Sequence, residues 1–254
     1  MGLLIKITSF LLIIILSSVF AGTVKADGPA TIPESFTATY QVLHKNRRLA
    51  NVTVMLSRNG NNWRLHGYTH DTRGLASLLK VRGTQTTTGW WQEGRFYPED
   101  YQFAFSLIGY KTAWFADFDW ATGTVTSKSR KWHKVLPMEG GLVDPLSLSM
   151  NIGLRLLDNP HKVAISVLDE DKIDQQFYQQ DRDETFDTAL GCVKATRVSR
   201  VRSHSKRTSI FWYADDYAYL PILIRHAKND GNDFKLKIIS LAVGGKPIQA
   251  ASKC

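Results

Sequence analysis

Short runs in which apolar and polar side chains alternate recur along almost the whole chain. Phe36, Ala38, Tyr40 and Val42 share one face of the first run, which is the two-residue period of a β-strand covered on one side. Further runs follow at positions 50–56, 101–107, 114–118, 163–167, 210–212, 222–224 and 234–238. Turn-forming residues separate the runs, and the count comes to about twelve strands at hairpin spacing. The pattern predicts a mainly β protein, built as a large curled antiparallel sheet or barrel-like sheet with one or two short helices.

Two segments depart from this period and predict helices. Asp144 can cap a helix whose first residue is Pro145, and Val143 can pack against Leu148 across the first turn. The apolar residues that follow cover so wide an arc that the helix must be buried. A shorter helix is predicted over 74–80. Helices beside a curled sheet are expected to cover its concave face.

The first 26 residues have the pattern of a secretory signal peptide. Lys6 precedes an apolar run, and Val24 and Ala26 stand at positions −3 and −1 of a cleavage site. An uncleaved membrane anchor is the alternative, but the apolar run is short for a span of about 20 residues. We therefore expect cleavage near Ala26. The rest of the chain is expected to comprise a linker at 27–34, a single β-rich domain at 35–243 and a fraying C-terminal tail at 244–254.

The remaining chain is basic and has no second apolar segment of membrane-spanning length. Lys and Arg number 32 against 23 Asp and Glu, a net charge of +9. Cleavage would remove Lys6 and Lys25 and no acid, so the mature chain stays basic. We expect a soluble periplasmic protein without a transmembrane span. An exported location disfavours nucleic acid as a partner.

The chain contains two cysteines, Cys192 and Cys254. In an oxidising compartment such a pair can form a disulfide, which in the chain-entropy model would contribute about 4 kcal/mol. Because Cys254 is the last residue, an unpaired thiol is equally compatible with the sequence. No motif of a catalytic cysteine surrounds Cys192.

The sequence lacks the motifs of common catalytic and metal sites. It has no G-x-S-x-G, no Gly-rich phosphate loop, no H-E-x-x-H and no Cys/His cluster. His66 and His70 would share one strand face, where a solvated polar surface is favoured over a metal site. The acidic clusters at 169–171 and 215–216 fall at turns, where Asp forms local hydrogen bonds. We expect no catalytic activity, no cofactor and no bound metal.

A basic run with one tryptophan is the clearest candidate for a surface contact. It consists of Lys128, Arg130, Lys131, Trp132 and Lys134. Cations around an amphipathic indole can bind lipid headgroups, lipopolysaccharide or an acidic glycan. The alternative is a solvated loop in a basic protein.

Aromatic residues concentrate between positions 90 and 120, and three tryptophans there are candidate ligand contacts. Trp90 and Trp91 are adjacent, so in a strand they point to opposite faces, and Trp114 and Phe115 do the same. Either core covers both faces, or one face is an exposed apolar surface that awaits a ligand.

Two stretches of the chain carry recognisable motifs. The stretch GLVDPLS at 141–147 contains D-P-L-S at the start of the predicted helix. The stretch at 210–222 is similar to the hairpin pattern W-x-A-x-D-x-x-x-L-P-V. In these two motifs the chain resembles the family of bacterial exported proteins of unknown function called DUF3108, and Tyr40, the segment 91–101 and the final strand also fit. The stretch after Tyr40 departs from the family, whose members commonly have a Gly-rich hairpin turn there.

The resemblance covers positions 36–242 and supplies no catalytic residues. Within it we expect structural roles for Asp144, Pro145 and Pro221. The expected fold is also similar to that of periplasmic lipoprotein carriers of the Lol type, a likeness of fold that says little about function.

Three classes of function remain open. A non-catalytic carrier would hold an acyl chain, a lipid or a lipidated peptide on its concave face, and should copurify with an apolar ligand. An envelope-assembly protein would meet a protein or glycan partner through the basic, aromatic surface, and should copurify with another chain. An uncharacterised periplasmic hydrolase or glycan-binding protein is the third class, and an enzyme should have a polar cleft with clustered titrating groups.

Overall fold

The computed structural model describes residues 33–158, 161–203, 206–217, 219–250 and 252–254. The predicted signal peptide and most of the predicted linker lie outside these residues. The described chain contains fifteen strands and two α-helices, so the prediction of a mainly β fold is confirmed.

The chain begins with a long series of antiparallel strands and one short helix. These elements are β1 (Phe36–His44), β2 (Arg47–Asn59), β3 (Asn62–His70), α1 (Gly74–Leu78), β4 (Arg82–Gln92), β5 (Arg95–Leu107), β6 (Tyr110–Asp119), β7 (Thr124–Ser129) and β8 (His133–Pro137). The second half contains α2 (Leu148–Asp158), β9 (Lys162–Asp169), β10 (Lys172–Thr188), β11 (Gly191–Val201), β12 (Arg207–Ala214), a 3₁₀ turn (Asp215–Tyr217), β13 (Pro221–Lys228), β14 (Asp233–Val243) and β15 (Lys246–Pro247).

All the strands belong to one antiparallel sheet that does not close. Its order is β8-β7-β6-β5-β4-β3-β2-β1-β14-β13-β12-β11-β10-β9, with β15 added beside β14. Two meanders, β1–β8 and β9–β14, are therefore joined where β1 pairs with β14. The free edge of β9 binds Val143, whose N–H donates to the Ser166 carbonyl. The predicted large curled sheet is confirmed.

Tight turns account for the hairpins. Lys45 and Asn46, the two residues between β1 and β2, both have positive φ, at 48° and 63°. Glu93 and Gly94, between β4 and β5, repeat the pattern at 49° and 73°. Positive φ at both central positions is the type I′ geometry that matches strand twist. The first hairpin thus forms a tight turn without the glycines common in the similar family.

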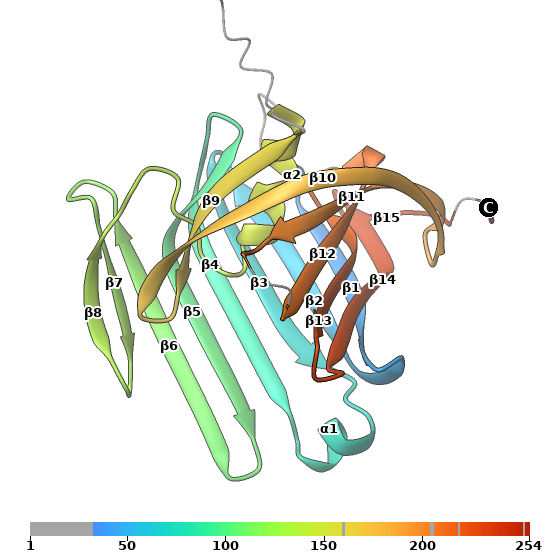
Figure 1. The fold of residues 1–254 in the computed structure, drawn as a ribbon, viewed down its shortest axis with the longest axis horizontal. Coiled ribbons are helices and arrows are strands. Elements are labelled where there is room, and N and C mark those ends of the chain that lie inside the picture. The colour runs from blue at the N-terminus through green and yellow to red at the C-terminus, as the bar shows by residue number, and fades with distance from the viewer. Residues whose placement is uncertain (1–32, 159–160, 204–205, 218, 251) are drawn as a thin grey trace, which may run out of the picture.

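Helix α2 lies between the two meanders (Figure 1). Met150 and Leu154 pack into the core cluster that contains Trp63 of β3. Ile152 and Leu156 pack on the other side, in the cluster formed with β9 to β12. Each fully buried side chain of this kind contributes about 1.5–3 kcal/mol. Burial on two sides explains the wide apolar arc in the sequence.

The start of α2 differs slightly from the prediction. The regular helix begins at Leu148, because residues 145–147 form a preceding turn. Asp144 caps that turn, since its Oδ1 accepts hydrogen bonds from the backbone N–H groups of Leu146 (2.8 Å) and Ser147 (3.1 Å). The second predicted helix is present as α1, which ends two residues before the predicted boundary at 80.

The C-terminal tail is attached to the sheet along much of its length, so the expectation that it frays was wrong. Cys254 forms a disulfide with Cys192 at the start of β11. The Cys192 N–H donates to the Ser252 carbonyl, and the Ile248 N–H donates to the Leu241 carbonyl. Backbone pairing and a covalent link therefore hold the chain end against β11 and β14.

Candidate ligand cavity and basic surface

A cavity of about 430 Å³ lies between α2 and the concave face of the sheet. Strands from both meanders contribute its walls, and α2 and the turn before it contribute one side. The apolar part of the lining includes Phe36, Tyr40, Val52, Val54, Leu65, Leu146, Leu148, Met150, Val167, Phe211, Ile224 and Leu236. A volume of this size is typical of small-molecule sites.

The cavity changes from apolar to polar at one level of the second meander. Along β13 the inward position after Ile224 is His226, and along β12 the inward position before Phe211 is Ser209. Register places these residues side by side, with Phe211 opposite Ile224 and Ser209 opposite His226. On β11, Arg200 lies opposite Tyr178 of β10 on the same face. Because the lining changes from apolar to polar at the same level on neighbouring strands, the polar side chains gather at one end of the cavity.

Hydrogen bonds connect the residues of the polar end into two groups, one around Asp174 and one around Ser209. Arg200 Nη2 donates to Asp174 Oδ2 at 2.7 Å, and Gln176 Nε2 donates to the same oxygen at 3.1 Å. Ser209 Oγ accepts a 3.0 Å hydrogen bond from Arg202 Nη2. Two buried donors, Arg200 Nε and Arg202 Nη1, remain without a partner among the described residues.

Electrostatics at this end favour an anion. Burial lowers the pKa of Arg202, and the neighbouring positive charge of Arg200 lowers it further. Burial also lowers the pKa of His226, with Arg202 and then Arg200 as additional causes. Burial is the larger cause of both pKa shifts, and repulsion from the neighbouring cations adds to it.

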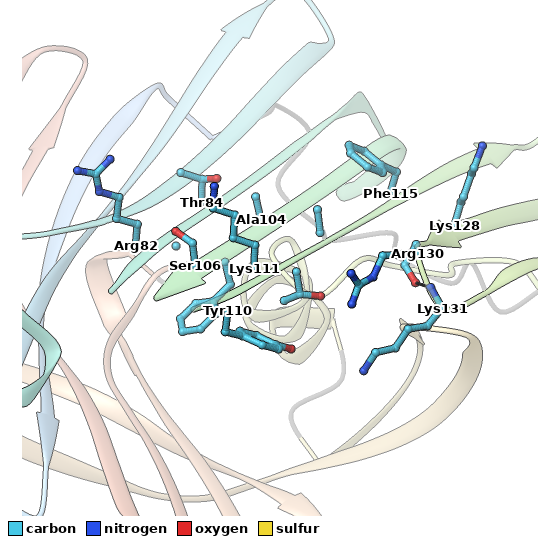
Figure 2. A pocket seen from close by; sticks show the side chains of 15 residues that line it. Arg82, Thr84, Ala104, Ser106, Tyr110, Lys111, Phe115, Lys128, Arg130 and Lys131 are labelled. Carbon is cyan, nitrogen blue, oxygen red and sulfur yellow. Dashed lines mark hydrogen bonds between the residues drawn. The ribbon is translucent and has the colours of Figure 1, made fainter. Parts of the chain in front are cut away.

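A second hollow, of about 980 Å³, lies on the first meander (Figure 2). It brings Lys128, Arg130 and Lys131 from the predicted basic run together with Arg82 of β4 and Lys111 of β6. The side chains of Lys128, Arg82 and Phe115 project to one side of the sheet in the view, whereas Tyr110 and Lys131 point to the other. Lys134 is exposed on the edge strand β8 and is outside this lining.

Trp132 is not an exposed part of the basic surface. It is half-buried and packs against the cluster formed by β5, β6 and β7. Its Nε1 donates a 3.1 Å hydrogen bond to Ser127 Oγ. A buried indole N–H normally requires such a partner, so the residue holds the loop against the sheet.

The other candidate tryptophans also lie mostly in the core. Trp91 and Trp114 are each 5% exposed, and they pack against Phe96 and Tyr101 respectively. Trp90 is half-buried and stacks on Tyr97, with ring centroids 5.6 Å apart. The core explanation therefore holds for Trp91 and Trp114, and Trp90 alone of the three has substantial exposed surface.

The residues that were expected to have structural roles lie in turns or at hydrogen-bonded positions: Asp144, Pro145 and Pro221. Asp144 is fully buried and also accepts a 2.8 Å hydrogen bond from Thr87 Oγ1 of β4, as well as one from Ser147 Oγ. Burial raises its pKa, and these hydrogen bonds oppose that shift. Pro221 starts β13, where a missing N–H is tolerated, and its carbonyl accepts a 2.9 Å hydrogen bond from the Tyr40 hydroxyl. Pro145 is exposed in the turn before α2 and contributes to the cavity lining.

His66 and His70 share a face that carries hydroxyl groups. His66 Nδ1 lies 2.9 Å from Thr86 Oγ1, and His70 Nε2 lies 2.9 Å from Thr53 Oγ1. Among the described residues, no group of three His, Cys, Asp or Glu side chains could hold a metal ion. In the same part of the chain, neither helix has the length and apolar character needed to cross a bilayer.

Sequence reasoning missed Arg200, Arg202, Ser209 and His226. The available signal was the continuation of an inward-facing apolar series by polar residues, as in Val198-x-Arg200-x-Arg202 and Ile224-x-His226. The signal is weak in each strand, because only the pairing of β10 to β13 shows that the polar positions meet.

One of the solved structures that align with the chain has the same general fold. The chain is similar to a "Beta-barrel-like Protein of Domain of Unknown Function DUF1849 from Brucella abortus", with a TM-score of 0.54, 10% sequence identity, and coverage of 84% of this chain and 99% of that one. It also aligns with "a putative lipoprotein from Parabacteroides distasonis", at a TM-score of 0.30 and 7% identity, over 85% of this chain and 97% of that one. The second likeness is too low to support an argument.

Sequence comparison identifies a family. No curated protein matches the chain. The family model described as "Protein of unknown function (DUF3108)" matches residues 35–238, which includes nearly all the strands, both helices and both hollows described above. The chain therefore belongs to the DUF3108 family.

Proposed function

We propose that this protein is a non-catalytic, exported envelope protein that binds an apolar ligand bearing an acyl chain in the cavity beneath α2. The observation that carries the proposal is the cavity itself, whose walls are mostly aliphatic and aromatic side chains from both meanders. Apolar surface in such a position gains free energy when a ligand removes it from water, at about 25 cal/mol per Å².

The open sheet supports a carrier role. Because β8 and β9 do not pair, the strand pairing that links the two meanders among the described residues is that of β1 with β14. On the other side, side-chain contacts such as the hydrogen bond from Ser127 Oγ to the Glu170 carbonyl connect β7 with the β9–β10 turn. A ligand could enter without breaking a closed ladder of backbone hydrogen bonds. Helix α2 contacts the cavity through Leu148 and Met150, which places it where it can adapt to ligand length.

The N-terminal pattern supports export. Lys6, the apolar run and the Val24-x-Ala26 site form a signal peptide by sequence. We propose that cleavage near Ala26 releases the protein into the periplasm. Sequencing the N-terminus of the protein from a periplasmic extract tests this, with Asp27 expected, and a membrane-bound product that keeps residues 1–26 contradicts it.

Ligand binding is tested with an apolar fluorescent probe, N-phenyl-1-naphthylamine. The parent protein should enhance its fluorescence, and hexadecanoic acid should displace it. Ile224→Trp adds an indole to the cavity wall and should weaken probe binding at least about tenfold, since the indole occupies part of the ligand volume. Val201→Trp is the matched control, because Val201 is 40% exposed and outside the lining.

Native mass spectrometry of protein extracted from its own envelope gives a second test, with a bound lipid expected. Equal probe binding by the parent and a folded Ile224→Trp variant would contradict the proposal.

A further inference from the structure

The polar end of the cavity has more positive charge than its own residues neutralise. Asp174 pairs with Arg200 at 2.7 Å, with both side chains at least partly shielded from water. Arg202 has a neutral hydroxyl, Ser209 Oγ, as its hydrogen-bond partner, and no carboxylate among the described residues pairs with it. Asp169 also lines the cavity, but it is exposed and lies opposite Lys172 at the end of β9.

Donors are available there for a ligand. Arg200 lines the cavity, whereas Arg202 lies outside the lining and is bonded to Ser209, which lines it. Arg200 Nε and Arg202 Nη1 are buried and lack acceptors among the described residues. An unsatisfied buried donor normally costs free energy, and a ligand oxygen could remove that cost. Guanidinium groups bind carboxylate and phosphate oxygens in fixed geometry.

We infer that the cavity binds an anionic amphiphile whose head group, a carboxylate or a phosphate, sits on Arg200, Arg202 and His226. This rests on the proposed function, because the acyl chain would occupy the apolar part of the same cavity. Ile224 and Phe211 lie immediately beyond the polar level on β13 and β12, so the chain continues directly from the head.

A chain-matched series of ligands tests the inference by displacement of the naphthylamine probe. Hexadecanoic acid supplies a carboxylate, palmitoyl-lysophosphatidic acid supplies a phosphate, and hexadecanol supplies no charge. The parent should bind at least one anionic ligand about tenfold more tightly than hexadecanol. Preference for the carboxylate indicates a free fatty acid, and preference for the phosphate indicates a phospholipid.

Variants locate the head group. Arg202→Gln should weaken binding of the preferred anionic ligand about tenfold and leave hexadecanol unchanged, because only the charged contact is lost. Arg202→Lys should recover part of the affinity. Arg182→Gln is the control, since Arg182 is 75% exposed and pairs with Glu184 outside the cavity.

Different results would contradict the head-group site and the proposed ligand cavity. A parent that binds hexadecanol and hexadecanoic acid equally well overturns the head-group site and leaves the cavity proposal standing. A parent that binds none of the three ligands contradicts the proposed function itself.

A different part of the molecule carries a second inference. Helix α1 has no buried residue, and its Leu75 and Leu78 are 66% and 75% exposed. Ile108, in the turn between β5 and β6, is 57% exposed, and its N–H donates to the Leu79 carbonyl at 2.9 Å. In Figure 1 both segments lie at the bottom of the molecule, away from α2. We call these three exposed side chains the apolar tip.

Cations surround the apolar tip, and acids are few. Arg73, Lys80, Arg82 and Lys111 are exposed on or beside it. The segments 72–92 and 101–116 contain no acidic residue. Asp71 directly precedes this region, and it pairs with Arg48 and Arg73. Exposed aliphatic residues within a cationic rim match an anionic lipid surface, in which the side chains enter the headgroup region.

The tip and the polar end of the cavity lie at the same end of the sheet. The Arg73 N–H donates to the Leu49 carbonyl, which attaches α1 to the start of β2. The start of β2 pairs with His44 at the end of β1. His44 pairs with Phe234 of β14, and Phe234 pairs with His226. We propose that the apolar tip docks on an anionic bilayer and so brings the polar end of the cavity toward the lipid.

Vesicle co-sedimentation tests this second proposal. The mature protein should bind phosphatidylglycerol vesicles more tightly than phosphatidylcholine vesicles, and salt should weaken the binding. The variant Leu75→Ser/Leu78→Ser/Ile108→Ser should bind at least about tenfold more weakly. The variant Lys80→Gln/Arg82→Gln/Lys111→Gln should lose the preference for phosphatidylglycerol.

Two controls keep the test specific. Val135→Ser on β8 removes another exposed aliphatic residue, 61% exposed, and should leave vesicle binding unchanged. Naphthylamine binding should survive in the tip variants, because no tip side chain lines the cavity. Equal vesicle binding by the parent and the triple Ser variant overturns the proposal. So does a dimer of the parent, seen by sedimentation, that the same variant dissociates.

Discussion

Two groups of cations in this molecule differ in what surrounds them. Lys128, Arg130 and Lys131, on β7 and the following turn, line a broad surface hollow. Arg200 is half-buried and lines one end of an apolar cavity, and half-buried Arg202 lies beside that end, bonded to Ser209 of the lining. Water and salt screen the first group, whereas burial strengthens every interaction of the second. The outer group therefore suits long-range attraction, and the inner group suits selection of one ligand chemistry.

The buried carboxylate Asp144 gives the largest expected effect and shows what burial does to a charge. Asp144→Ala removes the acceptor for Thr87 Oγ1, Ser147 Oγ and two backbone N–H groups. Leaving several donors unsatisfied should lower the free energy of unfolding by about 3 kcal/mol, as measured by urea denaturation. Asp119→Ala is the comparison, because exposed Asp119 also caps a turn and should cost less. A loss for Asp144→Ala no larger than that for Asp119→Ala would contradict the buried role.

Replacing an inner cation should raise the free energy of unfolding and weaken the binding of anionic ligands. Arg202→Met removes a poorly neutralised charge and keeps an aliphatic side chain, so the free energy of unfolding should rise by about 1 kcal/mol. The same variant should lose preference for anionic ligands in the displacement assay. A variant that becomes less stable while binding as before would show that Arg202 serves the fold alone.

Replacing the outer cations should leave the free energy of unfolding nearly unchanged and weaken binding to anionic vesicles. Replacing Lys128, Arg130 and Lys131 by Gln should change the free energy of unfolding by less than about 0.5 kcal/mol, since solvated charges contribute little. Binding to phosphatidylglycerol vesicles at low salt should weaken, because the hollow loses three of its cations. Adding Lys134→Gln tests whether the exposed edge strand contributes as well. Unchanged vesicle binding would mean that these residues are a solvated surface only.

The smallest effect concerns the pH dependence of stability. The hydrogen bond from Arg225 lowers the pKa of Asp233, so this carboxylate stabilises the fold above its unfolded pKa. That contribution should disappear as the pH falls through the folded pKa, because protonation breaks the pair. The contribution of Asp144 to stability changes with pH in the opposite direction. Burial raises the pKa of its carboxyl group in the folded protein, so this contribution decreases as the pH rises and the unfolded chain ionises. Melting temperatures between pH 3 and pH 7 should therefore fall less on acidification for Asp233→Asn than for the parent. A parallel fall in both proteins would exclude the Arg225 pair as a source of acid sensitivity.

The candidate site was only partly predictable. The basic run indicated Lys128, Arg130 and Lys131 because like charges close in sequence are visible as a cluster. Arg82 and Lys111 join them only through the pairing of β4, β5 and β6. Trp132 belonged to the same run, yet it turned inward because its indole N–H could reach Ser127. Proximity in sequence therefore identified the clustered cations, but it did not show that Trp132 packs against the sheet.

The inner site was invisible before the fold was known. Arg200, Ser209 and His226 come from three strands, and each looks like an ordinary polar residue in an alternating run. Their common level follows from the registers of β10 to β13. The tryptophans show the same limit, since alternation placed Trp90 and Trp91 on opposite faces but did not say which face the core would cover.

Strand period, tight turns, the capped start of α2 and the family resemblance depend on residues a few positions apart, and so they could be recognised in the amino-acid order alone. Burial depends on what packs against a side chain from distant parts of the chain. The curling of β9–β14 over β1–β8, with α2 between them, made a cavity from faces that a flat sheet would leave in water. The same curling placed Arg200 at the end of that cavity and held the C-terminal cysteine beside Cys192. Those positions arise from long-range packing, where the hydrophobic effect and backbone pairing act between segments far apart in sequence.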